Sequence, residues 1–276
     1  MEDEIKMAKE GVSLVGELIK AAGDNPEVKA AGSNLGTAAL TLSKAINNVL
    51  LPLAAVNFAF DKARKYFSEK FPEDMSASAS KIPPESLIAP KASIAGPVLQ
   101  CLTFAHDEPD LKSMYLGLLA SSMDARVAGD VHPAFVEIIK QLDSREAKYL
   151  ENLLAFAGTT YPIVEIRCVT AGQQGWFPIF RHLMRLTDDV SGLPSEDARF
   201  PASVDNWIRL GLVDVVYGTY LSGDNQYAWV ELQPEYCRLT ELHRSENVIV
   251  KFERGILRIT ELGNQFAIAV GLRRAT

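Results

Sequence analysis

The first quarter of the chain carries two apolar stripes at helical spacing. In residues 3–22 the apolar positions recur at intervals of three and four, which places them on one face of a helix. These positions are Ile5, Ala8, Val12, Val15 and Ile19. A second stripe with the same intervals runs through residues 35–67 and predicts a longer helix, in which Pro52 predicts a kink or break near residues 48–51. We expect both helices to pack their apolar faces against protein.

The pattern divides the remaining chain into three parts. Residues 72–84 show no period and are rich in Ser, Ala and Pro, which predicts a linker after the N-terminal amphipathic helices of residues 1–71. Residues 85–131 return to helical spacing and predict a helical bundle segment. Residues 132–276 begin with further helices, and Asp143 followed three residues later by Glu146 predicts a capping box at the start of one of them.

Strands are predicted only near the C-terminal end. A helix over residues 203–210 ends at Gly211 and leads into a strand at residues 212–216. The turn residues 222–225 then predict a hairpin that joins this strand to residues 226–232.

A second hairpin is predicted around Arg254 and Gly255, between residues 248–252 and residues 256–260. This order of helices and hairpins is similar to that of a winged-helix domain, so residues 132–276 are expected to form one. The predicted fold is therefore mainly α, with an N-terminal helical region and a C-terminal winged-helix-like α+β domain that contains small β-hairpins.

The composition is that of an ordinary soluble globular protein. Of the 276 residues, 47% are apolar and 23% are charged. The net charge of −7 argues against broad binding to nucleic acid, which requires Lys and Arg to neutralise phosphates. The acidic start of the chain differs from a basic signal peptide, so we expect a cytoplasmic protein, with peripheral contact to a membrane left open.

No motif for catalysis, cofactor binding or metal binding stands out. Gly11 and Gly16 have the spacing of a phosphate-binding loop, but Glu17 occupies the position of the required lysine. The four histidines have no second histidine or cysteine at the spacing of metal ligands, and the three cysteines are too widely spaced for a disulfide framework. We therefore predict no cofactor, no metal and no enzymatic activity.

A few residues are candidates for structural roles or for contact with a partner. Asp107 fits the N-cap position of a helix. His132 precedes a proline at a helix start, where we expect it to hold the turn, against Asp124. The candidate wing contacts to nucleic acid are Lys251, Arg254 and Arg258.

Short motifs in two parts of the chain carry a resemblance to a known family. They are Ile82-Pro83-Pro84, Ile94-Ala95-Gly96-Pro97, Asp107-Glu108-Pro109, Leu118-Leu119-Ala120, Met123-Asp124, His132-Pro133, Asp205-Asn206, Arg209-Leu210-Gly211-Leu212 and Ile259-Thr260-Glu261-Leu262-Gly263. With these motifs the chain resembles the abortive infection alpha (Abi-alpha) family of bacterial proteins associated with phage resistance. The resemblance implies a host defence protein that limits phage propagation, and it carries over no catalytic residues.

Three hypotheses about function follow. The leading one is a non-enzymatic defence protein whose helices in residues 1–71 bind a protein partner or a second copy of the chain. A first alternative is a membrane-perturbing effector, in which the helix of residues 35–67 acts on the bilayer. A second alternative is a weak winged-helix binder of nucleic acid, which would act through the predicted wing.

Overall fold

The structure is a computed structural model that describes residues 28–50, 57–172, 174–188, 190–223, 225–245 and 247–273. The helix predicted over residues 3–22 lies outside the described residues. The chain divides into two compact units, which are described separately. Unit 1 comprises Met1–Ala155 and Gln265–Thr276, and unit 2 comprises Phe156–Asn264.

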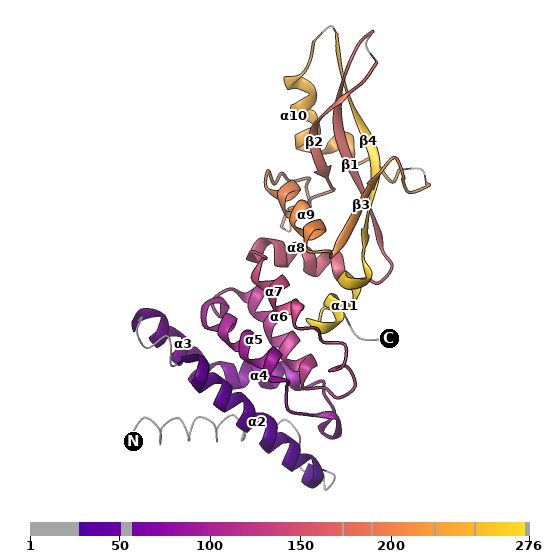
Figure 1. The fold of residues 1–276 in the computed structure, drawn as a ribbon. Helices are drawn as coiled ribbons and strands as arrows, with labels where there is room; N and C mark the ends of the chain where they lie inside the picture. The colour runs from indigo at the N-terminus through magenta and orange to yellow at the C-terminus, as the bar shows by residue number, and fades with distance from the viewer. Residues whose placement is uncertain are drawn as a thin grey trace. The chain divides into compact units, whose positions relative to one another are not determined.

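Unit 1 is built from α-helices (Figure 1). The first two described helices are α2 (Val28–Leu50) and α3 (Asn57–Glu69), and Pro52, where a kink or break is predicted, lies in residues 51–56, outside the described residues. Ala39 and Leu42, two members of the predicted stripe, are buried. In the described part of the chain, no helix combines the length and the apolar character needed to cross a bilayer. The other elements are α4 (Phe71–Ala79), the short 3-10 helix η2 (Pro84–Ser86), α5 (Ala92–Ala105), α6 (Pro109–Ser122), α7 (Ala134–Lys140), α8 (Ser144–Leu154) and the last turn of α11 (Glu261–Ala269).

The first part of the segment predicted as a linker is helical. Residues 71–79 form α4, which begins with Pro72 in its first turn and buries Phe71, Met75 and Ala79. These three residues are four apart, so they share one helix face. Pro, Glu and Asp separate Phe71 from Met75, and Ser and Ala separate Met75 from Ala79, so this short apolar stripe does not stand out in the sequence. The expectation of an irregular linker is therefore wrong for residues 72–79.

The capping box predicted at the start of α8 is confirmed. The carboxylate of Asp143 accepts a hydrogen bond from the backbone N–H of Glu146 at 2.7 Å. In return, the backbone N–H of Asp143 donates to the carboxylate of Glu146 at 3.0 Å. The two bonds satisfy N–H groups that a helix start otherwise leaves without a partner.

Unit 2 contains a four-stranded antiparallel sheet with the strand order β2-β1-β4-β3 (Figure 1). β1 pairs with β4 from Thr160, opposite Arg258, to Thr170, opposite Val248. The strands are β1 (Thr160–Thr170), β2 (Phe177–Leu183), β3 (Val213–Tyr217) and β4 (Val248–Ile259). The helical elements of the unit are α9 (Phe200–Arg209), the 3-10 helix η3 (Val230–Leu232), α10 (Pro234–Leu242) and the first residues of α11.

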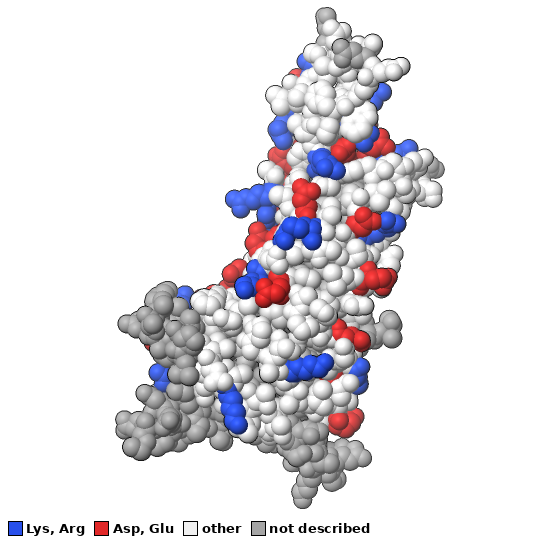
Figure 2. Space-filling view, viewed as in Figure 1, with Lys and Arg blue, Asp and Glu red and all other residues white. Residues whose placement is uncertain are grey.

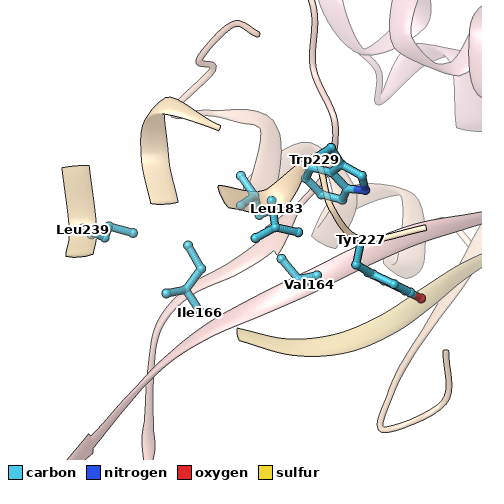
Figure 3. Close-up of a cluster of buried hydrophobic side chains, with 7 residues drawn as sticks. Val164, Ile166, Leu183, Tyr227, Trp229 and Leu239 are labelled. Carbon is cyan, nitrogen blue, oxygen red and sulfur yellow. The ribbon is translucent and has the colours of Figure 1, made fainter. Parts of the chain in front are cut away.

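One face of this sheet packs against the segment that carries η3 and α10 (Figure 3). Val164 and Ile166 of β1 point toward Leu239 of α10 and toward Trp229, which precedes η3. The complete buried cluster is Val164, Ile166, Leu183, Tyr227, Trp229, Val230 and Leu239. This cluster holds the helical segment on the sheet through burial of apolar surface.

Neither predicted hairpin forms. Residues 248–259 are one continuous strand, β4, and β3 pairs with β4 rather than with residues 226–232. Gly255 lies within β4 and not in a turn. A Cβ at this position would lie 2.6 Å from Tyr217 Cδ1 and 2.9 Å from the carbonyl oxygen of Val216. The glycine is needed for the close approach of β3. The fold is α+β, and its sheet includes two strands in residues 160–183 for which no strand was predicted.

Candidate functional site

Unit 1 has an open groove between α2 and α5, with a volume of about 610 Å³. The α2 wall consists of Thr41, Lys44, Ala45, Asn48 and Val49. The α5 wall consists of Ala92, Ala95, Gly96, Pro97, Gln100, Thr103 and Phe104.

Small side chains on α5 create this groove. Ala92, Ala95 and Gly96 lie within little more than one helical turn, and a Cβ added to Gly96 would meet no atom within 4 Å. At the end of the groove, the aromatic side chain of Phe104 is 61% exposed. An exposed apolar surface of this kind is typical of a site that binds another molecule.

The described lining of the groove is mostly uncharged. Lys44 is the one charged residue among the described residues that line it, and the others contribute alkyl, aromatic, hydroxyl and amide groups. The described lining holds no carboxylate, imidazole or thiol that could act as an acid, a base or a nucleophile. The groove can therefore accept the apolar face of a helix, with polar groups along its rim.

A second group of side chains surrounds His182 at the end of β2, in unit 2. His182 is 2% exposed and has a backbone φ of 59°, a left-handed conformation that few non-glycine residues adopt. Its Nε2 lies 3.1 Å from Asp205 Oδ1 on α9, and its Nδ1 lies 3.0 Å from the hydroxyl of Tyr217 on β3. The backbone N–H of His182 also donates to that hydroxyl at 3.1 Å.

These contacts fit a neutral His182 with its proton on Nε2, donated to Asp205, while Tyr217 donates its O–H to Nδ1. Burial lowers the pKa of His182, although the nearby Asp205 carboxylate opposes this change. Burial also raises the pKa of Tyr217 to about 12. Both groups are therefore neutral at neutral pH, and they connect β2, α9 and β3 through one hydrogen-bonded chain.

A charged network lies next to this group, on the sheet. The buried carboxylate of Glu165 on β1 is bound by Arg167 Nε at 2.7 Å and by Arg181 Nε at 3.0 Å. Arg167 also contacts Glu253 on β4 at 2.8 Å and lies 3.5 Å from the centre of the Trp176 ring. A buried carboxylate is stable only when it is paired, so the two guanidinium groups allow Glu165 to stay within the sheet.

The comparison with family models decides which family the chain represents. The model described as abortive infection alpha matches residues 63–270. The chain belongs to the abortive infection alpha family. The match includes α5, with its wall of the groove, and all four strands of the sheet, whereas α2 lies before it. No curated protein and no solved structure matched the chain.

Asp107 does not occupy the N-cap position of α6 that the sequence predicted for it. Helix α6 begins at Pro109 with Glu108 before it, while Asp107 forms an exposed ion pair with Lys62 at 3.1 Å. The hydrogen bond from Lys62 holds the pKa of Asp107 below its ordinary value. The pair therefore connects the end of α5 to α3, within unit 1.

Asp124 and His132 lie in the loop between α6 and α7 but do not bind each other. Asp124 is buried and is bound by Arg126 at 2.6 Å, and this hydrogen bond lowers its pKa. His132 accepts a hydrogen bond at Nδ1 from the backbone N–H of Ala134 at 3.1 Å. The prediction that His132 holds the turn is confirmed, and its predicted contact with Asp124 is wrong.

The candidate wing residues are spread along β4 because no wing hairpin forms there. Arg254 lies 3.8 Å from the centre of the Tyr220 ring, and Arg258 forms an ion pair with Asp214. Lys251 is exposed and lies opposite Arg167 on β1. From residue 251 to residue 258 the strand extends by roughly 23 Å, so these side chains do not gather at one tip.

No pattern in the sequence predicted the groove or the His182 group. The groove depends on where α5 lies against α2, and Asp205 and Tyr217 are 23 and 35 positions from His182 in the chain. Within the described ranges, no group of three or more His, Cys, Asp or Glu residues is placed to hold a metal ion.

Proposed function

We propose that this chain is a phage-defence protein that acts by binding a protein partner and not by catalysis. Membership of the abortive infection alpha family supports the defence role. In this proposal the contact region is formed by the helices of residues 1–71 together with α5. Self-association through residues 1–71 is one form that the contact can take.

The α2–α5 groove is the observation that carries this proposal. It has a volume of about 610 Å³ and exposes Phe104 at its end. Aromatic side chains are enriched at protein interfaces, and charged residues are depleted from their centres. The groove, with Lys44 as the one charged residue in its described lining, has this character.

A variant that fills the groove tests the proposal. Gly96→Trp adds a large side chain where no atom lies within 4 Å, and Gly129→Trp is a matched control at an equally open glycine that does not line the groove. Phage would be plated on bacteria that express each variant at the same level. We expect Gly96→Trp to lose protection and Gly129→Trp to keep it. If both variants protect as well as the original chain, the groove is not the contact surface.

No observation favours the nucleic-acid alternative over this proposal. On the face that Figure 2 shows, basic and acidic side chains are interspersed, and no continuous basic area covers it. Nucleic-acid surfaces require clustered Lys and Arg to neutralise phosphates. Lys251, Arg254 and Arg258 remain the residues to change to alanine in a mobility-shift assay at low salt, in which a shift lost by these variants would support the alternative.

The membrane alternative also remains a prediction. It assigns the activity to residues 35–67, of which residues 51–56 lie outside the described ranges. Leakage of dye from liposomes after addition of the full-length chain would support it, and the absence of both leakage and membrane association would exclude it.

A further inference from the structure

β3 forms one edge of the sheet in unit 2, because β4 is its only neighbour among the described strands (Figure 1). Two hydrogen bonds just beyond its ends show which of its backbone groups face β4. Thr260 N donates to Leu212 O at 3.1 Å, and Gly218 N donates to Arg254 O at 2.9 Å. Backbone groups alternate between the two sides of a strand, so the even-numbered residues of β3 bond to β4 and the odd-numbered residues turn their N–H and C=O groups away from it.

The accessible part of this edge begins after Val213. Val213 is 2% exposed, so its backbone groups are out of reach, whereas residues 214–217 are half-buried. Val215 and Tyr217 therefore present two N–H groups and two C=O groups at the edge. Among the described residues, none forms a hydrogen bond with these four groups. A row of unpaired backbone groups on a sheet edge is a template for another strand.

We propose that a second copy of the chain pairs with this edge, β3 against β3 in antiparallel orientation, about a two-fold axis at Val216. In this register Val215 of each copy lies opposite Tyr217 of the other, and each such pair exchanges two hydrogen bonds. All the unpaired groups of both edges are thereby satisfied, and the two sheets become one continuous sheet. The contact lies in unit 2 and goes beyond the proposed function, which concerns the helices of unit 1.

The side chains of the edge are complementary to themselves in this register. The pairs on either side of the axis each join a valine to a tyrosine, and such pairs of β-branched and aromatic side chains stabilise antiparallel sheets. The two copies of Val216 lie directly opposite each other. Asp214 lies opposite Gly218, which has no side chain, and its carboxylate is already paired with Arg258 of its own copy. No like charges therefore face each other across the axis.

The other edge of the sheet is protected against such pairing, and β3 is not. β2 contains Pro178, which has no N–H to donate, and its register against β1 shifts twice. β3 pairs with β4 without a shift and contains neither proline nor lysine. A two-fold axis repeats every favourable contact, which favours a second copy over an unrelated strand as the occupant.

This contact is small, so the dimer is expected to be weak. A standard protein interface buries about 1,600 Å², which is more than two short strands cover when they pair edge to edge. The fraction of dimer should therefore rise with the concentration of the chain, and a covalent trap is the suitable test.

A disulfide across the two-fold axis tests the occupant and the register together. Cys101→Ser and Cys237→Ser remove two of the three cysteines and leave Cys168, which is buried. Val216→Cys then places two thiols on residues whose Cα atoms are about 4.5 Å apart, within the range of a disulfide. Val215→Cys is the matched control, since this residue is also half-buried but its two copies lie diagonally, at roughly 9 Å.

The full-length variants would be oxidised mildly and separated on a non-reducing denaturing gel. We expect Val216→Cys to give at least fivefold more disulfide-linked dimer than Val215→Cys. Adding Val215→Pro to the Val216→Cys chain should reduce the dimer at least fivefold, because the proline removes an outward N–H and leaves the bonds from the even-numbered residues to β4 in place. Tryptophan fluorescence during urea unfolding shows whether unit 2 of the proline variant is folded, and the comparison of the two cysteine variants decides if it is not.

Equal yields of dimer from the two cysteine variants, or no dimer from Val216→Cys, would overturn the proposal. A folded Val215→Pro chain with an undiminished yield would overturn it as well. Gly96→Trp should leave the dimer unchanged, and a loss of dimer with this variant would assign self-association to the groove instead. If Val215→Pro abolishes phage protection while Val216→Cys gives no dimer, the edge binds a strand of another protein and the second copy is the wrong occupant.

Discussion

Replacing Gly117 with alanine should destabilise unit 1, although alanine is the better helix former. Gly117 lies within α6, and a Cβ at this position would be 2.1 Å from the carbonyl oxygen of Val270 and 2.6 Å from its carbonyl carbon. Ordinary contact begins near 3.4 Å, so the backbone at Val270 would have to move by about 1.3 Å. A backbone carbonyl cannot rotate away from the added group as a flexible side chain can.

The magnitude follows from two opposing contributions. Gly→Ala within a helix stabilises by up to ~1 kcal/mol, because alanine loses less conformational entropy on folding. Crowding of a packed interior costs about 1–3 kcal/mol or more. The upper part of that range applies here because two backbone bonds fix the end of α11, from Val270 N to Phe266 O at 2.9 Å and from Gly271 N to Ile268 O at 3.0 Å. We expect a net loss of about 2 kcal/mol in the free energy of unfolding.

Gly96→Ala is the matched control, since Gly96 also lies within a helix and its added Cβ meets nothing within 4 Å. It should raise the free energy of unfolding by about 0.5–1 kcal/mol. Denaturant unfolding followed by far-ultraviolet circular dichroism would measure both variants. Fluorescence of Trp176, Trp207 and Trp229, which all lie in unit 2, would report on that unit separately. A Gly117→Ala chain at least as stable as the original would refute the reasoning.

Three further predictions concern unit 2, and tryptophan fluorescence during urea unfolding measures each of them. Ile166→Ala removes a fully buried side chain from the cluster on the sheet and should cost about 2–5 kcal/mol, against about 0.5–1.5 kcal/mol for Ile166→Val; equal losses would contradict the packing argument. Burial lowers the pKa of His182, so the contribution of neutral His182 to the free energy of unfolding is complete above the unfolded-state pKa of 6.5 and is lost as the pH falls through the folded-state pKa. His182→Gln should therefore weaken the pH dependence of the free energy of unfolding, and an unchanged pH profile would contradict this role of His182. Burial raises the pKa of Glu235, and the nearby Glu196 carboxylate adds to the increase. Glu235→Gln should therefore stabilise unit 2 at neutral pH and lose this advantage as the pH falls through the folded-state pKa of Glu235. A variant that is less stable at neutral pH would show that the charged carboxylate stabilises the unit.

Features set by neighbouring residues could be predicted from the sequence. The apolar stripe of residues 35–67 indicated the buried positions Ala39 and Leu42 of α2, and Asp143 with Glu146 indicated the start of α8. Each depends on contacts within four positions of the chain, because helical hydrogen bonds and helix caps are local. Among the candidate residues, His132 was assigned to its turn for the same reason.

Features set by distant residues could not be predicted in this way. Arg254 and Gly255 have the composition of a turn, yet they lie within β4, where Gly255 makes room for Tyr217. The His182 group brings together side chains from β2, α9 and β3, none of which is unusual in its own segment.

The sequence by itself determined that much of residues 85–154 is helical and that α2 buries Ala39 and Leu42, because a repeat of three and four positions selects one face of a helix. Only the tertiary structure decided that residues 160–170 pair with residues 248–258, and that α5 turns Ala92 and Gly96 toward α2 to leave a groove. Strand pairing and helix packing join residues that are far apart in the chain. Their free energy depends on how complementary surfaces meet in space, which local periodicity does not encode.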